Sequence, residues 1–405
     1  MKVVIVNDFA YVNGGASSVA VASAAALARS GVDVVFFAAV GEPAAELAQS
    51  GVKTVTLGQS EIAADKNRLR AALQGLWNIR AASELGALLG GSRKDDTIVH
   101  IHSWTKSLSS CVARVALGRG FRVVLTLHDY FTACPNGGFY NYPQDCVCRL
   151  RPLSAACLTE DCDSRRYSHH LWRVLRQVVQ ERAGLLPRGI GHFIAVSKFS
   201  RDILKPFLPP AAQVQVLANP VAADQGGPAP VAENDRFLFV GRQTPEKGPL
   251  LLADALSKLR ARAIFAGDGP LKRAVQERCP SAEMPGWLDR AALRIQIRRA
   301  LALVLPSLWY ETQGLVVLEC AASGVPAIVP DLCAASEFVE HGRTGLIFKR
   351  GDKADLADKM RSLLADRALA ARLGRAAYEK FWAAPPSAQA HAAGLLDIYR
   401  QMLSR

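Results

Sequence analysis

The sequence predicts an α/β protein made of two parallel-sheet domains, and three observations lead to this fold class. The chain has 405 residues, which is more than one ordinary hydrophobic core organises. Short β-branched runs alternate with longer helical patterns, as in parallel strands that are joined by helical crossovers. This alternation stops in the Pro-, Gly- and Ala-rich segment 218–235 and then starts again, so a domain boundary is expected there.

The first half of the chain is expected to form one sheet. Apolar runs that predict its strands occupy residues 3–6, 32–40, 97–103, 122–129, 192–197 and 214–220. Helical patterns separate them at residues 17–30, 66–89 and 105–118. We assign residues 1–220 to an N-terminal Rossmann-like domain, with an insertion of little periodicity at 130–170.

The second half repeats the pattern. Its predicted strands occupy residues 236–242, 261–269, 302–307, 326–331 and 345–348. We assign residues 221–385 to a C-terminal Rossmann-like domain, and the helical pattern in 386–405 can pack back on the N-terminal domain. Two such halves around one hinge would face each other across a cleft, at the carboxyl ends of their strands.

Composition narrows the class of protein. Half of the residues are hydrophobic and 21% are charged, and no stretch is long and apolar enough to span a bilayer. No secretory pattern follows Lys2, so a cytoplasmic location is expected, either free or at the cytoplasmic face of the membrane. The net charge of +13 favours a phosphate-rich ligand or an anionic membrane surface. No nucleic-acid-binding module is recognisable, so nucleic acid is not an expected partner.

The stretch LWYETQGLVVLECAASGVP, residues 308–326, carries two carboxylates around a glycine. A helix is expected to begin at Gly314 and Leu315, where free N–H groups could hold a phosphate. Glu311 before that point and Glu319 inside the helix could accept hydrogen bonds from hydroxyls of a sugar and a ribose. The alternative is an acidic residue that complements the helix dipole, followed by a solvated glutamate.

Two further motifs precede that stretch. In FVGRQTPEKGP a strand leads into a turn with Arg242 and Lys247, and two cations at such a junction suit a diphosphate. They could equally be exposed surface charges. In PGW, Trp287 follows a glycine whose backbone could meet a nucleobase, although Trp287 could also be a core aromatic.

Taken in order, VGR…EKG, AGDGPL, PGW, the Glu-x7-Glu pair, AASGVPAI and EFVEHGRTGLIF resemble the nucleotide-sugar domain of glycosyltransferase family 4, which has the GT-B fold. The resemblance covers residues 236–350. It implies that Glu311 contacts the donor sugar, that Glu319 holds the ribose, and that Arg242 and Lys247 neutralise the leaving diphosphate. Gln313 stands where the family often has an aromatic residue.

The first half resembles the acceptor domain of the same family. In FAYVNGGASSVA, Gly14 and Gly15 would let the backbone approach the donor phosphates, or they could form an ordinary strand-to-helix turn. In VVLTLHDY, His128 matches the histidine beside the reacting carbon of the donor. Taken alone, a histidine at a strand end is more often structural, and His100 and His102 are in the same situation.

The resemblance implies a retaining enzyme that moves a hexose-type sugar from a UDP or GDP donor to a hydroxyl of a sugar or lipid-linked sugar acceptor. Polysaccharide or glycoconjugate synthesis for the cell envelope is the expected setting. No Asp-x-Asp element lies in a predicted donor loop, so no catalytic metal is expected. The alternatives are another GT-B enzyme, such as a sugar-nucleotide epimerase or a phosphorylase, and a non-catalytic subunit that binds sugar nucleotides. The oligomeric state is not indicated.

The insertion holds five of the nine cysteines in a segment without hydrophobic periodicity. In a reducing compartment, four thiolates in tetrahedral array would suit a structural zinc ion. The predicted ligands are Cys134, Cys148, Cys157 and Cys162. The alternatives are buried or free thiols, or a disulfide.

The segment 168–183 is an amphipathic helical pattern with arginines around its apolar face. The first interpretation is a surface helix that turns its apolar face to the core. The second is a peripheral patch for anionic lipid or a lipid-linked acceptor.

Overall fold

The computed structural model describes residues 1–404, and these form two compact units. Unit 1 contains residues 1–138, 150–220 and 386–404, and unit 2 contains residues 139–149 and 221–385. Each unit has its own parallel sheet, so the predicted α/β class with two parallel-sheet domains is confirmed.

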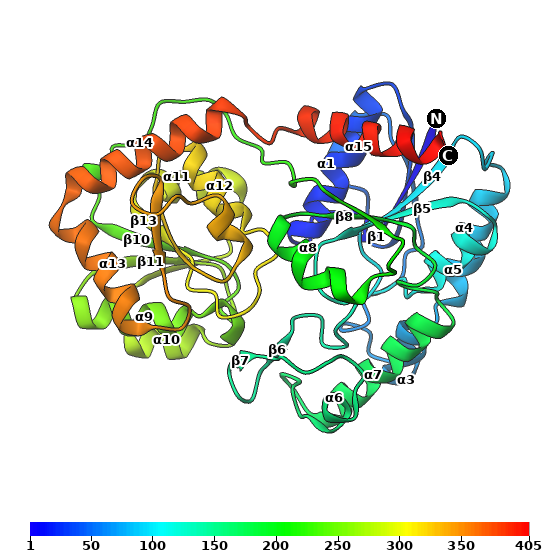
Figure 1. Cartoon of the computed structure of the whole chain (residues 1–405), viewed down its shortest axis with the longest axis horizontal. Helices are drawn as coiled ribbons and strands as arrows, with labels where there is room; N and C mark the ends of the chain where they lie inside the picture. Colours follow the sequence, from blue (N-terminus) through cyan, green and yellow to red (C-terminus); the bar gives the residue numbers. More distant parts are fainter. Residues whose placement is uncertain (405) are drawn as a thin grey trace. The chain divides into compact units, whose positions relative to one another are not determined.

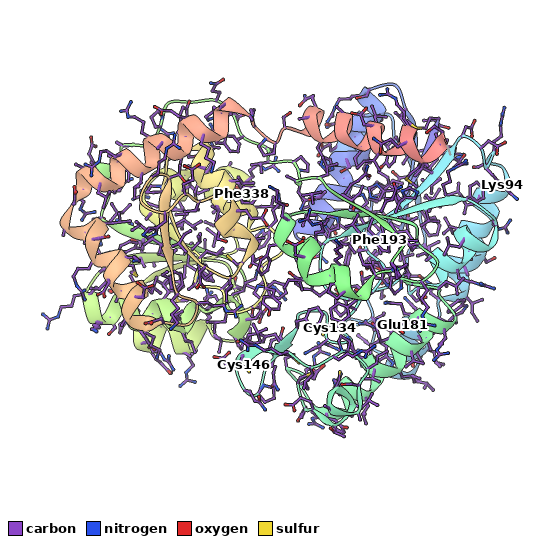
Figure 2. All side chains as sticks on the ribbon, viewed as in Figure 1. Lys94, Cys134, Cys146, Glu181, Phe193 and Phe338 are labelled. Carbon is purple, nitrogen blue, oxygen red and sulfur yellow. The ribbon has the colours of Figure 1, made fainter. Side chains whose placement is uncertain are left out.

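Unit 1 is built on a seven-stranded sheet in the order β3-β2-β1-β4-β5-β8-β9, and every neighbouring pair is parallel (Figure 1). Strand β1 is buried along almost its whole length, because helices cover both faces of the sheet. Phe193 of β8, labelled in Figure 2, is 1% exposed inside this unit. The strands are β1 Lys2–Phe9, β2 Asp33–Val40, β3 Lys53–Thr56, β4 Thr97–Ile101, β5 Arg122–Leu127, β8 His192–Ala195 and β9 Gln213–Val216.

The last helix of the chain, α15, belongs to unit 1 and packs against α1. His391 Nε2 lies 3.1 Å from Ser23 Oγ of α1, and the α15 side chains Leu395 and Tyr399 are fully buried. The helices of this unit are α1 Gly15–Arg29, α2 Ala45–Gln49, α3 Arg68–Leu76, α4 Ile79–Gly90, α5 Cys111–Gly118, α6 Ala155–Thr159, α7 Tyr167–Arg182, α8 Lys198–Leu204, the 3₁₀ turn η1 Lys205–Phe207 and α15 Ala388–Leu403.

Two helical predictions for unit 1 differ from the structure. The pattern at 66–89 forms two helices, because the side chain of Asn78 caps α4 by accepting from the Ala81 N–H. The helix expected from residue 105 begins only at Cys111. The backbone before it folds around the buried carboxylate of Asp8, which accepts the N–H groups of residues 106–108. Strand β3 was not predicted.

Unit 2 has a six-stranded sheet in the order β12-β11-β10-β13-β14-β15, again parallel throughout. Its core is a continuous cluster of buried apolar residues, against which Phe338 packs (Figure 2). The strands are β10 Arg236–Val240, β11 Arg262–Ala266, β12 Glu283–Gly286, β13 Ala300–Val304, β14 Ala327–Pro330 and β15 Gly345–Phe348. The helices are η2 Val231–Glu233, η3 Pro245–Lys247, α9 Pro249–Leu259, α10 Lys272–Arg278, α11 Arg290–Arg298, α12 Leu315–Ala322, η4 Ala334–Glu337, α13 Lys353–Ala365 and α14 Arg367–Ala383.

The cysteine-rich insertion is ordered into short elements. Strands β6, Tyr140–Asn141, and β7, Cys146–Val147, form an antiparallel hairpin that groups with unit 2. Helix α6 follows and groups with unit 1. Across residues 1–404, no helix is long and apolar enough to cross a membrane.

Candidate functional site

The loops that follow β10, β11 and β12 are hydrogen-bonded to one another at the carboxyl edge of the unit 2 sheet. The Gly241 N–H donates to Ala266 O at 3.0 Å, and the Gly267 N–H donates to Gly286 O at 2.7 Å. A Cβ on Gly267 would lie 2.1 Å from Gly241 O, and its φ of +127° also requires glycine. The AGDG turn is therefore needed to bring these three loops together.

The turn η3 connects this edge to the loop after β13. Gly248 ends η3 with φ +65°, and a Cβ there would lie 2.0 Å from Pro306 O. The Leu308 N–H donates to Glu246 O at 2.9 Å. These contacts carry Lys247 to the segment that contains Glu311, 64 residues further along the chain.

Lys247 and Glu311 form a close ion pair. Lys247 Nζ lies 2.8 Å from Glu311 Oε2 and 3.1 Å from Oε1, and the two side chains are 18% and 11% exposed. Ser307 Oγ and Trp309 Nε1 also donate to Glu311 Oε2, at 3.1 and 3.0 Å. Lys247 Nζ lies 4.9 Å from the centre of the Trp309 ring, so the cation also faces an aromatic surface.

This environment sets the charge of Glu311. Burial by itself would raise the pKa of its carboxyl, but the charge and hydrogen bonds of Lys247, helped by Trp309 and Ser307, outweigh it. The pKa of Glu311 therefore lies below its ordinary value of 4.5. Glu311 is ionised at neutral pH and can accept a further hydrogen bond from a hydroxyl.

Arg242 is the exposed member of the site. Its side chain is 68% exposed, whereas its partner Glu246 is 2% exposed, with Arg242 Nη2 at 3.3 Å from Glu246 Oε1. Thr244 Oγ1 donates to the same oxygen at 2.7 Å. Glu246 thus holds the base of the turn, while most of the Arg242 guanidinium stays open to a ligand.

Helix α12 begins where the sequence predicted. Gly314 precedes it with φ +76°, and a Cβ there would lie 3.0 Å from the Cβ of Ala335. Glu319 lies within α12, and burial raises the pKa of its carboxyl against the opposing charge of Arg290. The first N–H groups of α12, at Leu315 and after it, have the polarity that an anion requires.

Trp287 is not a core aromatic, because its side chain is 75% exposed after the PGW turn. Its backbone N–H donates to Asp268 Oδ2 at 3.2 Å, which ties the turn after β12 to the turn after β11. The ring therefore offers an open face on which a planar base could stack.

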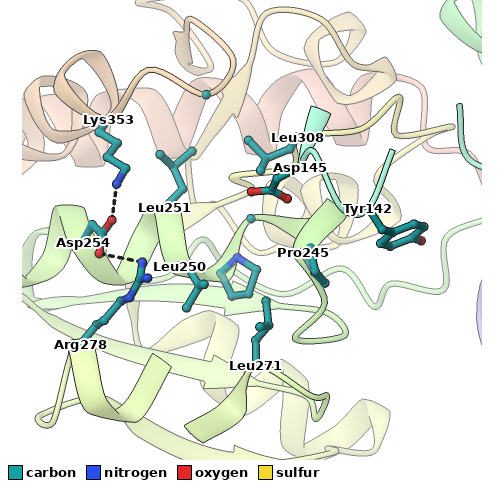
Figure 3. Close-up of a pocket in the computed structure, with 13 residues that line it drawn as sticks. Tyr142, Asp145, Pro245, Leu250, Leu251, Asp254, Leu271, Arg278, Leu308 and Lys353 are labelled. Carbon is teal, nitrogen blue, oxygen red and sulfur yellow. Dashed lines mark hydrogen bonds and ion pairs between the residues drawn. The ribbon is translucent and has the colours of Figure 1, made fainter. Parts of the chain in front are cut away.

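A separate cavity of about 430 Å³ lies beside α9 (Figure 3). Asp254 on its wall accepts from Arg278 at 3.1 Å and from Lys353 at 2.5 Å, so its charges are paired within the wall. Arg242, Lys247, Glu311 and Glu319 are not among the residues that line it. The cavity adjoins the η3 turn through Pro245 and Gly248, but these four predicted side chains do not line it.

Unit 1 contributes three histidines that lie together. His100 Nδ1 is 2.6 Å from Tyr399 Oη of α15, and His100 Nε2 is 2.7 Å from Thr126 Oγ1. His102 Nδ1 is 2.9 Å from His128 Nε2, and those two rings are nearly parallel. The structure therefore brings together the VHIHS and VVLTLHDY motifs, which the sequence analysis considered separately.

These rings are neutral at physiological pH. Burial lowers the pKa of His128 to about 3, and it lowers the pKa of His100 and of His102 well below the ordinary value. His102 Nε2 is buried, with no hydrogen-bond partner in residues 1–404. Because a buried N–H without an acceptor is rarer than a buried lone pair, His102 is assigned its proton on Nδ1. It then donates to His128 Nε2, which leaves the His128 proton on Nδ1.

The glycine loop of unit 1 is open. Gly14 precedes α1 with φ +109°, a backbone conformation that favours glycine, and nothing lies within 4 Å of a Cβ placed on Gly14 or on Gly15. Both residues are exposed. The loop leaves room for a ligand.

The predicted zinc site at Cys134, Cys148, Cys157 and Cys162 stays a prediction. Within residues 1–404, no group of three or more His, Cys, Asp and Glu side chains could hold a metal ion. Cys148 belongs to the segment of unit 2, whereas Cys134, Cys157 and Cys162 belong to unit 1. Cys162 Sγ lies 3.4 Å from His170 Nδ1, a contact that the cysteine spacing did not indicate.

Several residues that contact the candidate site residues were missed from the sequence. Ser307 and Trp309 both donate to Glu311, and Glu246 positions Arg242. Ser307 and Trp309 could have been predicted, because they lie four and two residues before Glu311 in the sequence. Tyr399 was not predictable, because it reaches His100 from 299 residues away.

Comparison with known proteins gives the same picture for both units. The family described as Glycosyltransferase Family 4 matches residues 13–225, and the family described as Glycosyl transferases group 1 matches residues 226–380. Glycogen synthase of Mycobacterium tuberculosis is 30% identical over 304 residues, which is 69% of this chain and 70% of that protein. The sulfoquinovosyl transferase SQD2 of Arabidopsis thaliana is 35% identical over 157 residues, 36% of this chain and 30% of that protein.

Solved structures show the same fold. The sucrose-phosphate synthase of Thermosynechococcus elongatus has a TM-score of 0.71 at 18% identity, over 100% of this chain and 99% of that chain. The Anabaena protein Alr3699/HepE, solved with UDP and glucose, has a TM-score of 0.70 at 15% identity, over 99% of this chain and all of that chain. From these matches, this chain belongs to glycosyltransferase family 4 and is a nucleotide-sugar-dependent glycosyltransferase with the GT-B fold.

Proposed function

We propose that this enzyme transfers a hexose from a UDP- or GDP-sugar to a hydroxyl of a sugar or lipid-linked sugar acceptor, with retention of the anomeric configuration. The observation that carries the proposal is the Lys247–Glu311 pair next to the exposed Arg242. It joins a cation for a diphosphate to an ionised carboxylate for a sugar hydroxyl in one small volume of unit 2.

Each predicted residue has a role in the proposal. Lys247 and Arg242 stabilise the negative charge that develops on the leaving diphosphate, together with the N-terminal N–H groups of α12 at Gly314 and Leu315. Glu311 accepts a hydrogen bond from the donor sugar and holds it in reacting geometry.

The nucleoside end of the donor would use Glu319 for the ribose hydroxyls and Trp287 for the base. The exposed Trp287 ring supports the second assignment. In unit 1, His128 would lie beside the reacting carbon of the donor, and the backbone at Gly14 and Gly15 would approach the donor phosphates. His128 is kept neutral, so it would act as a hydrogen-bond donor and not as a cation.

Transfer with retention would follow a same-face route. The leaving phosphate accepts the proton of the acceptor hydroxyl while the sugar–phosphate bond breaks and the new glycosidic bond forms. The chain's own groups supply charge stabilisation, and no covalent sugar–enzyme bond is needed. A cytoplasmic setting and cell-envelope polysaccharide synthesis are part of this proposal.

The test is incubation of the pure chain with a panel of UDP- and GDP-sugars and a cell-envelope extract, followed by mass spectrometry and NMR of the product. Retention predicts that an α-linked donor gives an α-linked product. An inverted product would refute the same-face route, and an epimerised donor without transfer would favour the epimerase alternative. Donor binding without any turnover would favour a non-catalytic subunit.

A further inference from the structure

Helix α7 of unit 1 turns an apolar stripe outward. Leu171, Leu175 and Val178 follow one another at helical spacing and are 45%, 50% and 41% exposed. The interpretation of segment 168–183 as a helix whose apolar face covers the core is therefore wrong for these three residues. Burial of such side chains is favourable by about 25 cal/mol per Å², so an exposed stripe needs an explanation.

The rotation of α7 is fixed by its polar side. Gln177 and Gln180 face inward and are 1% and 2% exposed. Gln180 Oε1 accepts from Trp104 Nε1 at 2.9 Å, and Gln180 Nε2 donates to Phe131 O at 3.0 Å. Turning α7 to bury its leucines would break these hydrogen bonds and bring glutamines to the surface.

Helix α3 adds a second set of exposed leucines. Leu69 and Leu73, four residues apart, are 72% and 58% exposed. The two helices lie side by side (Figure 1). They pack closely, because a Cβ on Gly75 of α3 would lie 2.6 Å from the Trp172 ring of α7. We call Leu69, Leu73, Leu171, Leu175 and Val178 on these adjoining helices the α3–α7 face.

The same two segments are strongly basic. Residues 66–80 and 165–182 contain nine lysines and arginines and a single acidic residue, Glu181, in a chain whose net charge is +13. Arg70 and Arg173 are paired with Asp65 and Asp163, and Arg176 is buried, so the other six carry the exposed charge. Glu181, labelled in Figure 2, lies 3.9 Å from Arg188. In the described residues 1–404, Arg166 and Arg182 form no ion pair of their own. This part of the surface is therefore cationic as well as apolar.

We propose that the α3–α7 face docks onto an anionic lipid bilayer. Exposed leucines on a helix with arginines beside them fit the boundary between lipid headgroups and acyl chains. Anionic headgroups complement the arginines, and a few such charges are enough for reversible attachment. A second copy of this chain is a poorer partner, since two cationic faces would repel each other.

The inference rests on the proposed function in one respect only. A lipid-linked acceptor would give the enzyme a reason to work at a bilayer, but the attachment itself is independent of catalysis. It can therefore be measured without turnover.

The experiment is co-sedimentation of the full chain with vesicles of phosphatidylcholine alone or with added phosphatidylglycerol. We expect binding to the anionic vesicles only, weakened by high salt. The double variant Leu171→Asp/Leu175→Asp should lower partitioning by about tenfold or more, since it removes two of the three apolar side chains of the α7 stripe and adds two negative charges. Ile295→Asp/Leu332→Asp in unit 2 is the matched control, because Ile295 and Leu332 are 58% and 48% exposed and the variant adds the same two negative charges. It should bind like the parent chain.

Three results would overturn the proposal. They are no binding of the parent chain to anionic vesicles, unchanged binding of the double variant, and a parent dimer that the double variant dissociates while vesicles stay unbound. Thermal unfolding of each variant should match the parent, because the changed leucines are exposed. A chain that transfers sugar without binding vesicles contradicts only the docking surface, and one that binds vesicles without transfer contradicts only the proposed function.

Discussion

The histidine cluster of unit 1 and the Lys247–Glu311 region of unit 2 stabilise polar groups inside the protein in opposite ways. The histidine cluster of unit 1 is uncharged, with His100 and His102 buried and His128 half-buried, and its rings are held by neutral hydrogen bonds to Tyr399, Thr126 and one another. The Lys247–Glu311 region of unit 2 keeps full charges and compensates them in pairs. A network of neutral hydrogen bonds fixes the orientation of its side chains. An ion pair instead keeps two full charges in the protein interior, and a bound ligand can interact with either of them.

This difference bears on the proposed roles of Lys247 and His128. In the proposed donor site, the ion pair with Glu311 compensates the charge of Lys247 when no ligand is bound, and the proposed ligand of Lys247 is the donor diphosphate. The proposed role of His128 at the reacting carbon requires a hydrogen-bond donor of defined direction, and the contact of His102 Nδ1 with His128 Nε2 at 2.9 Å can set that direction. The following predictions test this contrast, from the largest expected effect to the smallest.

Lys247→Ala should lower kcat/KM by about 1,000-fold, because it removes a charge-assisted contact to the leaving group. It should also lower the thermal stability, since Glu311 would remain buried without its cation. Steady-state kinetics and thermal unfolding measure the two effects.

Arg242→Ala is the matched control for that variant. It should lower kcat/KM by about 100-fold, but it should lower stability less than Lys247→Ala does, because the Arg242 side chain is 68% exposed and Glu246 keeps its hydrogen bond from Thr244. Near-normal turnover in both variants would contradict the diphosphate assignment.

His128→Ala should lower kcat by about 100-fold and leave the affinity for nucleoside diphosphate unchanged. His102→Ala should have a smaller effect, about tenfold on kcat, since it removes only the group that directs His128. His102→Asn, which keeps a donor near the Nδ1 position, should recover part of the activity.

The ¹⁵N chemical shifts of His128 decide whether His102 acts through its tautomer. They should report a proton on Nδ1 in the parent chain and a mixture of tautomers in His102→Ala. An unchanged tautomer together with reduced activity would mean that His102 has a merely structural role.

Glu319→Ala should weaken the binding of free nucleoside diphosphate by about tenfold, which corresponds to one lost hydrogen-bonding group on the ribose. Glu311→Gln should change that affinity less and lower kcat more, because the sugar is absent from the free nucleotide. Isothermal calorimetry with UDP and GDP measures both. Equal losses of affinity would contradict the division of roles between the two glutamates.

The acid stability of the two units should differ. The pKa of His128 is lowered to about 3 and that of His391 to about 4, both from 6.5, so the unfolded chain binds more protons than the folded chain in that window. Unit 1 should lose stability as the pH falls below about 6.5, by up to about 1.4 kcal/mol per pH unit for each buried histidine.

Buried carboxyl groups also affect the dependence of stability on pH. Burial raises the pKa of Asp129 to about 6, so its protonation in the folded state offsets part of the loss in unit 1. In unit 2 the lowered pKa of Glu311 removes stability only below its ordinary value of 4.5. Hydrogen exchange against pH should show unit 1 weakening first, and His391→Gln should reduce its pH dependence. Equal weakening of both units near pH 6 would contradict the contrast.

The sequence by itself determined the fold class, the two sheets and much of the donor motif. Hydrophobic periodicity and β-branched runs are local properties of the sequence. Strand β15 was therefore predicted at its observed bounds, residues 345–348, and helix α15, residues 388–403, lies within the helical pattern predicted for 386–405. The start of α12 after Gly314 was predicted for the same reason, since a glycine at a helix start is a local signal.

Only the tertiary structure decided which distant groups meet. The pairing of Lys247 with Glu311 depends on Gly248 passing against Pro306, and the contact between His100 and Tyr399 depends on the return of α15 to unit 1. The outward stripe of α7 is of the same kind. Its amphipathic pattern is local, but the inward direction of Gln177 and Gln180 is set by partners on other segments, so periodicity could not tell which face meets the core.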